Sequence, residues 1–210
     1  MYHTLIFGHS ICRRLQEHIS RGTDSRLSPD LRLARKSKIS IVGRGGLTLQ
    51  QLMADGGRLL DSLVDNTLTF DVIFLQLGGN DFAPNERVPE DFSLQLLALA
   101  ALLHGRYKVR RIVVGYILPR FSCRGREDPV FVQRYSAWAQ TVNAGLRHHS
   151  RDLAYVSVWD HNNTFTFPSA SHKGGRRFFS RDGVHLSNQG QYRLYKSIRG
   201  ALMNAFHSLA

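Results

Sequence analysis

The most continuous apolar stretch of the 210-residue chain is Phe70-Asp71-Val72-Ile73-Phe74-Leu75-Gln76-Leu77, and the turn-forming residues Gly78-Gly79-Asn80-Asp81 follow it directly. A nearly unbroken apolar run of this length is expected of a central parallel strand that is covered on both faces. Glycine, asparagine and aspartate predict that the strand ends in a turn. This stretch favours an α/β fold built on a parallel sheet.

Strand-like and helix-like segments alternate on both sides of this strand. Strands are expected at 2–7, 38–42, 70–77, 111–118 and 153–158, and helices at 11–19, 48–63, 89–103, 130–148 and 187–209. Residues 20–37, 119–128 and 160–181 are expected to be loops. The alternation predicts a five-stranded, mostly parallel sheet with helices on both faces. The length suits one domain covering residues 1–210.

The formal net charge is +12, and it is unevenly distributed. Residues 105–126 and 173–199 each contain seven Lys or Arg, whereas residues 52–91 contain eight acidic residues and two arginines. A basic surface attracts the phosphates of nucleic acid or of anionic lipid headgroups. The alternative is a solvated surface that only keeps the protein soluble, and composition leaves both open.

Cysteine content and apolar runs indicate the cellular compartment in which the protein is expected. The two cysteines, Cys12 and Cys123, are too few for a disulfide framework and favour a reducing, intracellular environment. The N-terminus lacks the pattern of a signal peptide, and no apolar run approaches the roughly 20 residues that span a bilayer. We therefore expect a cytoplasmic protein.

A candidate nucleophile, Ser10, lies where the first strand passes into the first helix. The apolar run Leu5-Ile6-Phe7 ends in Gly8-His9-Ser10, and a helical pattern begins at Ile11. Partial positive charge gathers at a helix N-terminus, where an oxyanion is stabilised. Serine is also a good N-cap, so this position alone leaves both roles open.

Other strand ends supply the remaining groups that acyl transfer requires. Gly46 offers a backbone N–H after the second strand, and Asn80 offers a side-chain amide after the third. Such donors stabilise the charge that develops on a carbonyl oxygen. Asp182 and His185 are three residues apart, so the carboxylate can bond one imidazole nitrogen and leave the other free as a base.

The segments Gly8-His9-Ser10, Gly45-Gly46-Leu47-Thr48, Gly78-Gly79-Asn80-Asp81 and Asp182-Gly183-Val184-His185 resemble, in order, the four sequence blocks of the SGNH (GDSL-like) hydrolase superfamily. The resemblance implies a three-layer α/β/α sandwich of flavodoxin-like type. It implies a serine esterase in which Ser10 is the nucleophile, His185 the base and Asp182 its orienting partner. The Ser10 and Gly46 N–H groups and the Asn80 amide would form the oxyanion hole. No metal or cofactor is expected, and the substrate would be a small carboxylic ester or a lipid.

A second resemblance covers residues 182–202, which are similar to esterase-like domains encoded by animal retroelements. It suggests an alternative function, a module that binds nucleic acid or an anionic membrane through its basic surface with weak or no catalysis. Intact Ser10, Asp182 and His185 favour the enzyme over this alternative.

The chain departs from the family pattern at His9, where an aspartate is usual. A histidine can replace its hydrogen bonds only in one tautomer, and an unperturbed histidine becomes cationic near pH 6.5. Substrate choice and pH response are therefore open at this position.

Further residues have plain structural alternatives. Cys12 is expected to be a buried hydrophobe, and Asn80-Asp81 could serve only as a turn. The aromatic residues before Asp182 either line an acyl pocket or anchor a loop, with the anchor favoured; they are Phe165, Phe167, Phe178 and Phe179. Four histidines lack the spacing of metal ligands, namely His148, His149, His161 and His172.

Overall fold

The computed structural model describes all residues of the chain except 55–60, 63–68, 83–90, 124 and 169–173. Its strands are β1 (Tyr2–Gly8), β2 (Ser37–Gly43), β3 (Val72–Gln76), β4 (Arg111–Gly115) and β5 (Val156–Trp159). Its helices are α1 (Ser10–Ser20), α2 (Leu49–Met53), α4 (Phe92–Tyr107), α5 (Pro129–His149) and α6 (Asn188–His207), with short 3-10 helices η2 (His161–Asn163) and η3 (Arg176–Phe178).

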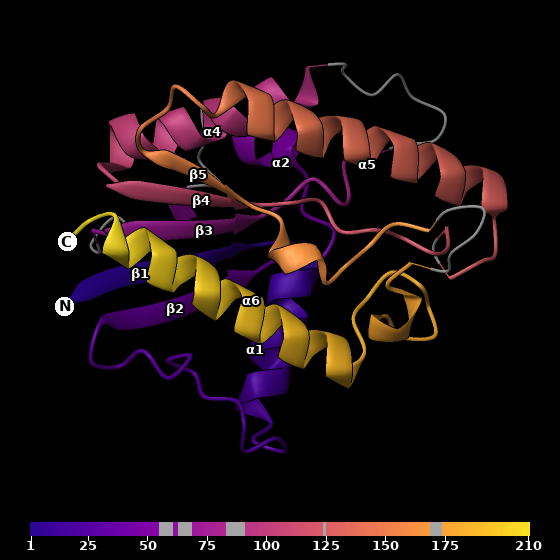
Figure 1. Ribbon diagram of the computed structural model, residues 1–210, viewed down its shortest axis with the longest axis horizontal. Coiled ribbons are helices and arrows are strands. Elements are labelled where there is room, and N and C mark those ends of the chain that lie inside the picture. The colour runs from indigo at the N-terminus through magenta and orange to yellow at the C-terminus, as the bar shows by residue number, and fades with distance from the viewer. Residues whose placement is uncertain (55–60, 63–68, 83–90, 124, 169–173) are drawn as a thin grey trace.

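The five strands form one sheet in the order β2-β1-β3-β4-β5, and every pairing between them is parallel. Helices α1 and α6 cover one face of this sheet, and α2, α4 and α5 cover the other (Figure 1). The expected α/β/α architecture is therefore confirmed. Because all strands run the same way, their carboxyl ends meet at one edge, where sites form in sheets of this kind.

Strand β3 is apolar from Val72 to Leu75 because helices cover both of its faces. Ile73 and Leu75 pack with α4 and α5, whereas Val72 and Phe74 pack with α1 and α6. The neighbouring strand β1 divides in the same way, since Leu5 and Phe7 face the first core and Ile6 the second. Alternate residues of a strand point to opposite faces, so a strand between two helix layers has few polar positions.

Most strand ends lie within one or two residues of the sequence prediction, and two differ by three residues. The predicted strand 111–118 ends at Gly115, because both backbone polar groups of Ile117 bond the Asn143 side chain of α5 instead of a strand. The predicted strand 153–158 begins at Val156, because Leu153 and its neighbours form a turn, in which the Val156 N–H donates to the Leu153 carbonyl at 2.8 Å. The predicted loop 160–181 contains η2 and η3.

Helix starts follow the capping rules. Thr48 caps α2 with a capping box that includes Gln51, Asp128 caps α5 ahead of Pro129, and Ser187 caps α6. These side chains satisfy N–H groups that the helix itself leaves free. The predicted extension of α2 to Leu63 and the predicted start of α4 at Pro89 fall mostly outside the described residues.

Glycines allow the elements at the site edge to approach closely. A Cβ on Gly8, at the end of β1, would lie 2.3 Å from the Gln76 carbonyl oxygen of β3. A Cβ on Gly43, at the end of β2, would lie 2.1 Å from the Arg13 nitrogen of α1. Only residues without a side chain fit such contacts, so these glycines set where α1 begins relative to the sheet.

Candidate active site

Ser10 begins helix α1 at the carboxyl edge of the sheet. The N-cap of this helix is His9, and the His9 N–H donates to the Gln76 carbonyl of β3 at 3.2 Å. The interpretation of Ser10 as a simple N-cap is therefore wrong. Ser10 is only 8% exposed, and its backbone N–H belongs to the first turn, where helix dipoles favour negative charge.

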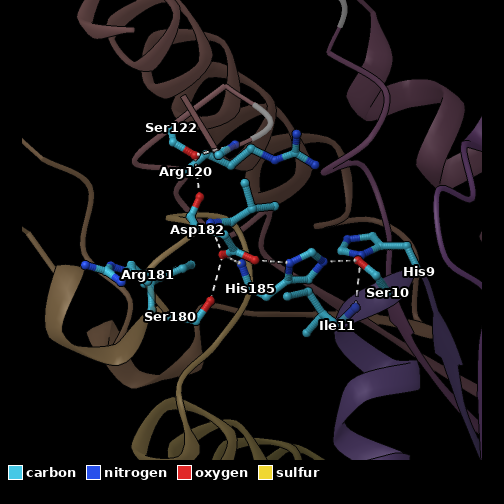
Figure 2. A network of polar contacts seen from close by, with 12 residues as sticks. His9, Ser10, Ile11, Arg120, Ser122, Ser180, Arg181, Asp182 and His185 are labelled. Carbon is cyan, nitrogen blue, oxygen red and sulfur yellow. Dashed lines mark hydrogen bonds and ion pairs between the residues drawn. The ribbon is translucent and has the colours of Figure 1, made fainter. Parts of the chain in front are cut away.

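Ser10, His185 and Asp182 form one chain of hydrogen-bonding groups (Figure 2). The Ser10 Oγ lies 3.2 Å from His185 Nε2, and His185 Nδ1 lies 2.7 Å from Asp182 Oδ2. The geometry places Nε2 within reach of the serine proton. The three residues predicted from the sequence are thus brought together from both ends of the chain.

The second oxygen of Asp182 fixes the turn that carries His185. Oδ1 accepts hydrogen bonds from the Val184 N–H at 2.9 Å, the His185 N–H at 2.9 Å and the Ser180 hydroxyl at 2.7 Å. Burial by itself raises the pKa of the Asp182 carboxyl, but the hydrogen bonds from His185, Ser180 and Val184 outweigh burial and leave the pKa well below its usual range. Asp182 therefore stays ionised and holds the imidazole orientation.

The loop after β4 also holds the Asp182–His185 turn in place through hydrogen bonds. The Phe121 N–H donates to the Gly183 carbonyl at 2.8 Å, and the Ser122 hydroxyl bonds the Asp182 carbonyl. Gly183 has a φ of +67°, a conformation that glycine adopts without strain. The Asp182–His185 turn is consequently held by groups outside itself.

Asn80 joins two of the loops at the sheet edge. Its side-chain nitrogen donates to the Leu47 carbonyl at 3.0 Å, and its side-chain oxygen accepts from Arg120 at 2.9 Å. The first bond ties the loop after β3 to the turn that contains Gly46, whose φ is +72°. An amide nitrogen has two N–H groups, so one remains for another acceptor. The oxyanion-hole assignment of Ser10, Gly46 and Asn80 stays a prediction.

His9 is neutral in this structure. Burial first, and then the charges of Arg120 and His185, lower the pKa of His9 to about 3. His9 Nδ1 accepts a hydrogen bond from the Ile11 N–H at 3.4 Å, which places the proton of the neutral ring on Nε2. The sequence left the charge of His9 near pH 6.5 open, and the lowered pKa favours the neutral ring in the folded protein. His9 acts as a cap acceptor, a role that aspartate also fills.

Ser10 lines a small pocket at the site. Its lining combines parts of α1, the loops after β3 and β4, one side chain of α5 and the Asp182–His185 turn; the residues are His9, Ser10, Ile11, Gly79, Leu118, Pro119, Arg120, Tyr135 and Val184. The sequence interpretation did not include Arg120 or Tyr135. The place of Arg120 just beyond the fourth predicted strand could have indicated a site residue. Tyr135 lies within a helix, and only tertiary packing brings it to the pocket.

The aromatic residues before Asp182 do not line this pocket. Phe165, Phe178 and Phe179 are buried in the core beside α6, where the Phe165 ring packs edge to face against each of the other two, which supports the anchor interpretation for these three. Cys12 is fully buried, and burial raises the pKa of its thiol to about 12. It is therefore an inert core residue, as predicted.

The described residues contain neither a candidate metal centre nor a candidate membrane-spanning helix. Within them, no three His, Cys, Asp or Glu side chains gather in a way that could hold a metal ion. No helix among them is both long and apolar enough to cross a bilayer. Of the four histidines considered as ligands, His172 lies outside the described residues.

The parallel five-stranded sheet brings the Ser10, His185 and Asp182 side chains together at its carboxyl edge. The chain belongs to the GDSL-like lipase/acylhydrolase family, whose model matches residues 6–193. The resemblance to SGNH hydrolases is confirmed, and the further resemblance to retroelement domains gains no support.

Solved structures agree with this fold. A GDSL-like lipase from Bacteroides thetaiotaomicron is similar with a TM-score of 0.72 and 16% identity, covering 97% of this chain and 89% of its own. A lipase/acylhydrolase from Enterococcus faecalis has a TM-score of 0.65 at 18% identity, with 98% and 97% covered. An acetyl xylan esterase from Geobacillus stearothermophilus has a TM-score of 0.60 at 14% identity, with 94% and 92% covered. Among curated proteins, none matches the sequence significantly.

Proposed function

We propose that the protein is a serine esterase that hydrolyses carboxylic esters, acyl or acetyl, through an acyl-enzyme. The observation that carries the proposal is the line of contacts from Ser10 Oγ to His185 Nε2 at 3.2 Å and from His185 Nδ1 to Asp182 at 2.7 Å. Family membership supports the general activity, and the names of two similar structures, a lipase and an acetyl xylan esterase, support an ester as substrate.

In this mechanism the Ser10 oxygen attacks the ester carbonyl carbon while His185 Nε2 removes the hydroxyl proton. The tetrahedral intermediate collapses, the bond to the alcohol oxygen breaks, and His185 returns the proton to the leaving alcohol. Water then attacks the Ser10 ester with the same histidine as base, which releases the acid and regenerates Ser10. Asp182 stabilises the imidazolium and remains ionised throughout, consistent with the direction of its pKa shift.

The oxyanion of the intermediate would be stabilised by the N–H groups of Ser10 and Gly46 and by the Asn80 amide. Support for Asn80 comes from its two bonds to Leu47 and Arg120, which fix the orientation of the amide. Support for Ser10 comes from its place in the first turn of α1. Preorganised donors of this kind contribute because they need no rearrangement as charge develops.

Hydrolysis of p-nitrophenyl acetate tests the proposal. We expect the wild type to turn the ester over and Ser10→Ala to lose at least about three orders of magnitude in kcat, because the nucleophile is removed. Ser25→Ala is a matched control, since Ser25 is exposed and does not line the pocket. Equal rates for Ser10→Ala and the wild type would refute the assignment.

A further inference from the structure

Arg120 places a positive charge in the wall of the Ser10 pocket. It follows Pro119 in the loop after β4 and lines the pocket together with Ser10 and His9. Figure 2 shows it on the side of the site opposite to Ser180. Its guanidinium donates to the Asn80 side-chain oxygen at 2.9 Å and lies over the Tyr135 ring, 5.3 Å from the centroid.

The loop that carries Arg120 is fixed at both ends. On the side of β4, the buried Asn143 side chain bonds both backbone groups of Ile117, at 2.8 and 3.1 Å, and the Tyr135 hydroxyl donates to the Leu118 carbonyl at 2.9 Å. On the other side, Phe121 bonds Gly183 in the His185 turn. The guanidinium is therefore preorganised, and a ligand that binds it does not need to order the loop.

The charge of Arg120 is not neutralised by a nearby carboxylate in the described part of the chain, where no acidic oxygen lies within 4.0 Å of the guanidinium. The bond to Asn80 goes to a neutral amide and uses one of five N–H donors. Asp81 interacts with Arg120 only at longer range, and burial raises the pKa of that carboxyl to about 6. The field of Arg120 also contributes to the low pKa of His9.

We propose that Arg120 binds an anionic group of the substrate, so that the site selects carboxylic esters bearing a second, negatively charged group such as a carboxylate. This inference rests on the proposed esterase function and specifies its substrate class. Arginine suits the role because its planar fork recognises carboxylate oxygens in charge-assisted hydrogen bonds. A merely structural arginine would act by orienting Asn80, and it would then affect neutral and anionic esters equally.

Two pairs of esters test the proposal, and each pair contains one anionic and one neutral ester of similar size. The quantity measured is kcat/KM for the anionic ester divided by kcat/KM for the neutral ester. Mono-p-nitrophenyl glutarate and p-nitrophenyl valerate place the charge on the acyl side. 4-Acetoxybenzoate and its methyl ester place it on the alcohol side. Each ratio is compared between variants, so differences in intrinsic reactivity cancel.

In at least one pair, we expect Arg120→Gln to lower this ratio about tenfold or more, as loss of a charge-assisted hydrogen bond predicts. Arg120→Lys keeps the charge but not the fork, so it should retain part of the ratio. Arg134→Gln is the matched control, since it removes one positive charge from an exposed position of α5, and its ratio should stay near that of the wild type. The proposal would be overturned if the anionic-to-neutral ratio of kcat/KM were the same for Arg120→Gln and Arg134→Gln in both ester pairs. This holds even if Arg120→Gln slows the hydrolysis of all four esters equally.

Binding separates this inference from the esterase assignment. In Ser10→Ala protein, monomethyl glutarate should bind at least about tenfold more tightly than dimethyl glutarate, and Arg120→Gln in that background should remove the difference. Selective binding without any turnover by the wild type would refute the esterase and retain the anion site. Turnover that depends on Ser10 without any charge preference would refute the anion site alone.

Discussion

The Ser10 hydroxyl lies 3.2 Å from Nε2 of His185, although 175 positions separate the two residues in the chain. The contact exists because β1 ends at the carboxyl edge of the parallel sheet and the turn that carries His185 lies beside that edge. Ser10 is positioned by the start of α1 and His185 by the hydrogen bonds of Asp182. The proposed chemistry depends on this contact between Ser10 and His185, which different parts of the structure hold in place.

If the three residues act as a unit, their substitutions are not additive. We expect His185→Ala to lose nearly as much esterase activity as Ser10→Ala, and the double variant to lose no more than either. Steady-state rates with p-nitrophenyl acetate measure this. His148→Ala, an exposed histidine of α5, should retain the wild-type rate. Retained activity in His185→Ala would mean that another group is the base.

Buried neutral His9 should make the fold sensitive to mild acid. In the unfolded chain His9 binds a proton below about pH 6.5, whereas burial, Arg120 and His185 keep its folded pKa at about 3. Between these values the unfolded state binds one more proton. The free energy of unfolding therefore falls as pH falls, by roughly 1.4 kcal/mol per pH unit for this group.

His9→Asn keeps a cap acceptor but does not titrate, so it should remove this part of the pH dependence. Urea unfolding of both proteins between about pH 7 and pH 5 measures the two slopes. The comparison isolates His9 from other groups, among them His161, whose pKa burial lowers to about 4. Identical slopes for the two proteins would show that His9 titrates normally in the folded state.

Asn143 is predicted to be the main clamp on the loop after β4. It is 5% exposed, and its side chain satisfies both the N–H and the carbonyl of Ile117. Asn143→Ala leaves two buried backbone groups without partners, which costs about 2–4 kcal/mol of stability. Urea unfolding measures the loss. Thr141→Ala, exposed on the same helix, should change stability by no more than about 0.5 kcal/mol, and a similar small change in Asn143→Ala would contradict the clamp.

The fold was predictable because its signals are local. The apolar runs that become β1 and β3 alternate with helical patterns, and Thr48 and Ser187 mark helix starts as their residue types suggest. The Ser10, Asp182 and His185 set was also predictable, because the four sequence blocks that resemble SGNH hydrolases occur in order along the chain, whereas the position of Ser10 alone left its role open. The true end of β4 was not, because it depends on Asn143, which lies 26 positions beyond Ile117.

Two features of the site needed the structure for a similar reason. His9 is expected to titrate normally from its residue type, but the surrounding core and Arg120 lower its pKa. Arg120 is one of 28 Lys and Arg residues in the sequence, and its place just beyond a predicted strand did not reveal its contacts with Asn80 and Tyr135. Electrostatic interactions and long-range packing arise only in the folded protein, so local sequence patterns do not predict them.

Covalent capture of the nucleophile tests the central claim most directly. A fluorophosphonate probe reacts with an activated serine, and peptide mass spectrometry locates the labelled residue. The account predicts one adduct on Ser10 in the wild type, no adduct in Ser10→Ala, and strongly slowed labelling in His185→Ala, because the hydroxyl then lacks its base. Labelling of a different residue, or equal labelling of Ser10→Ala, would contradict the account.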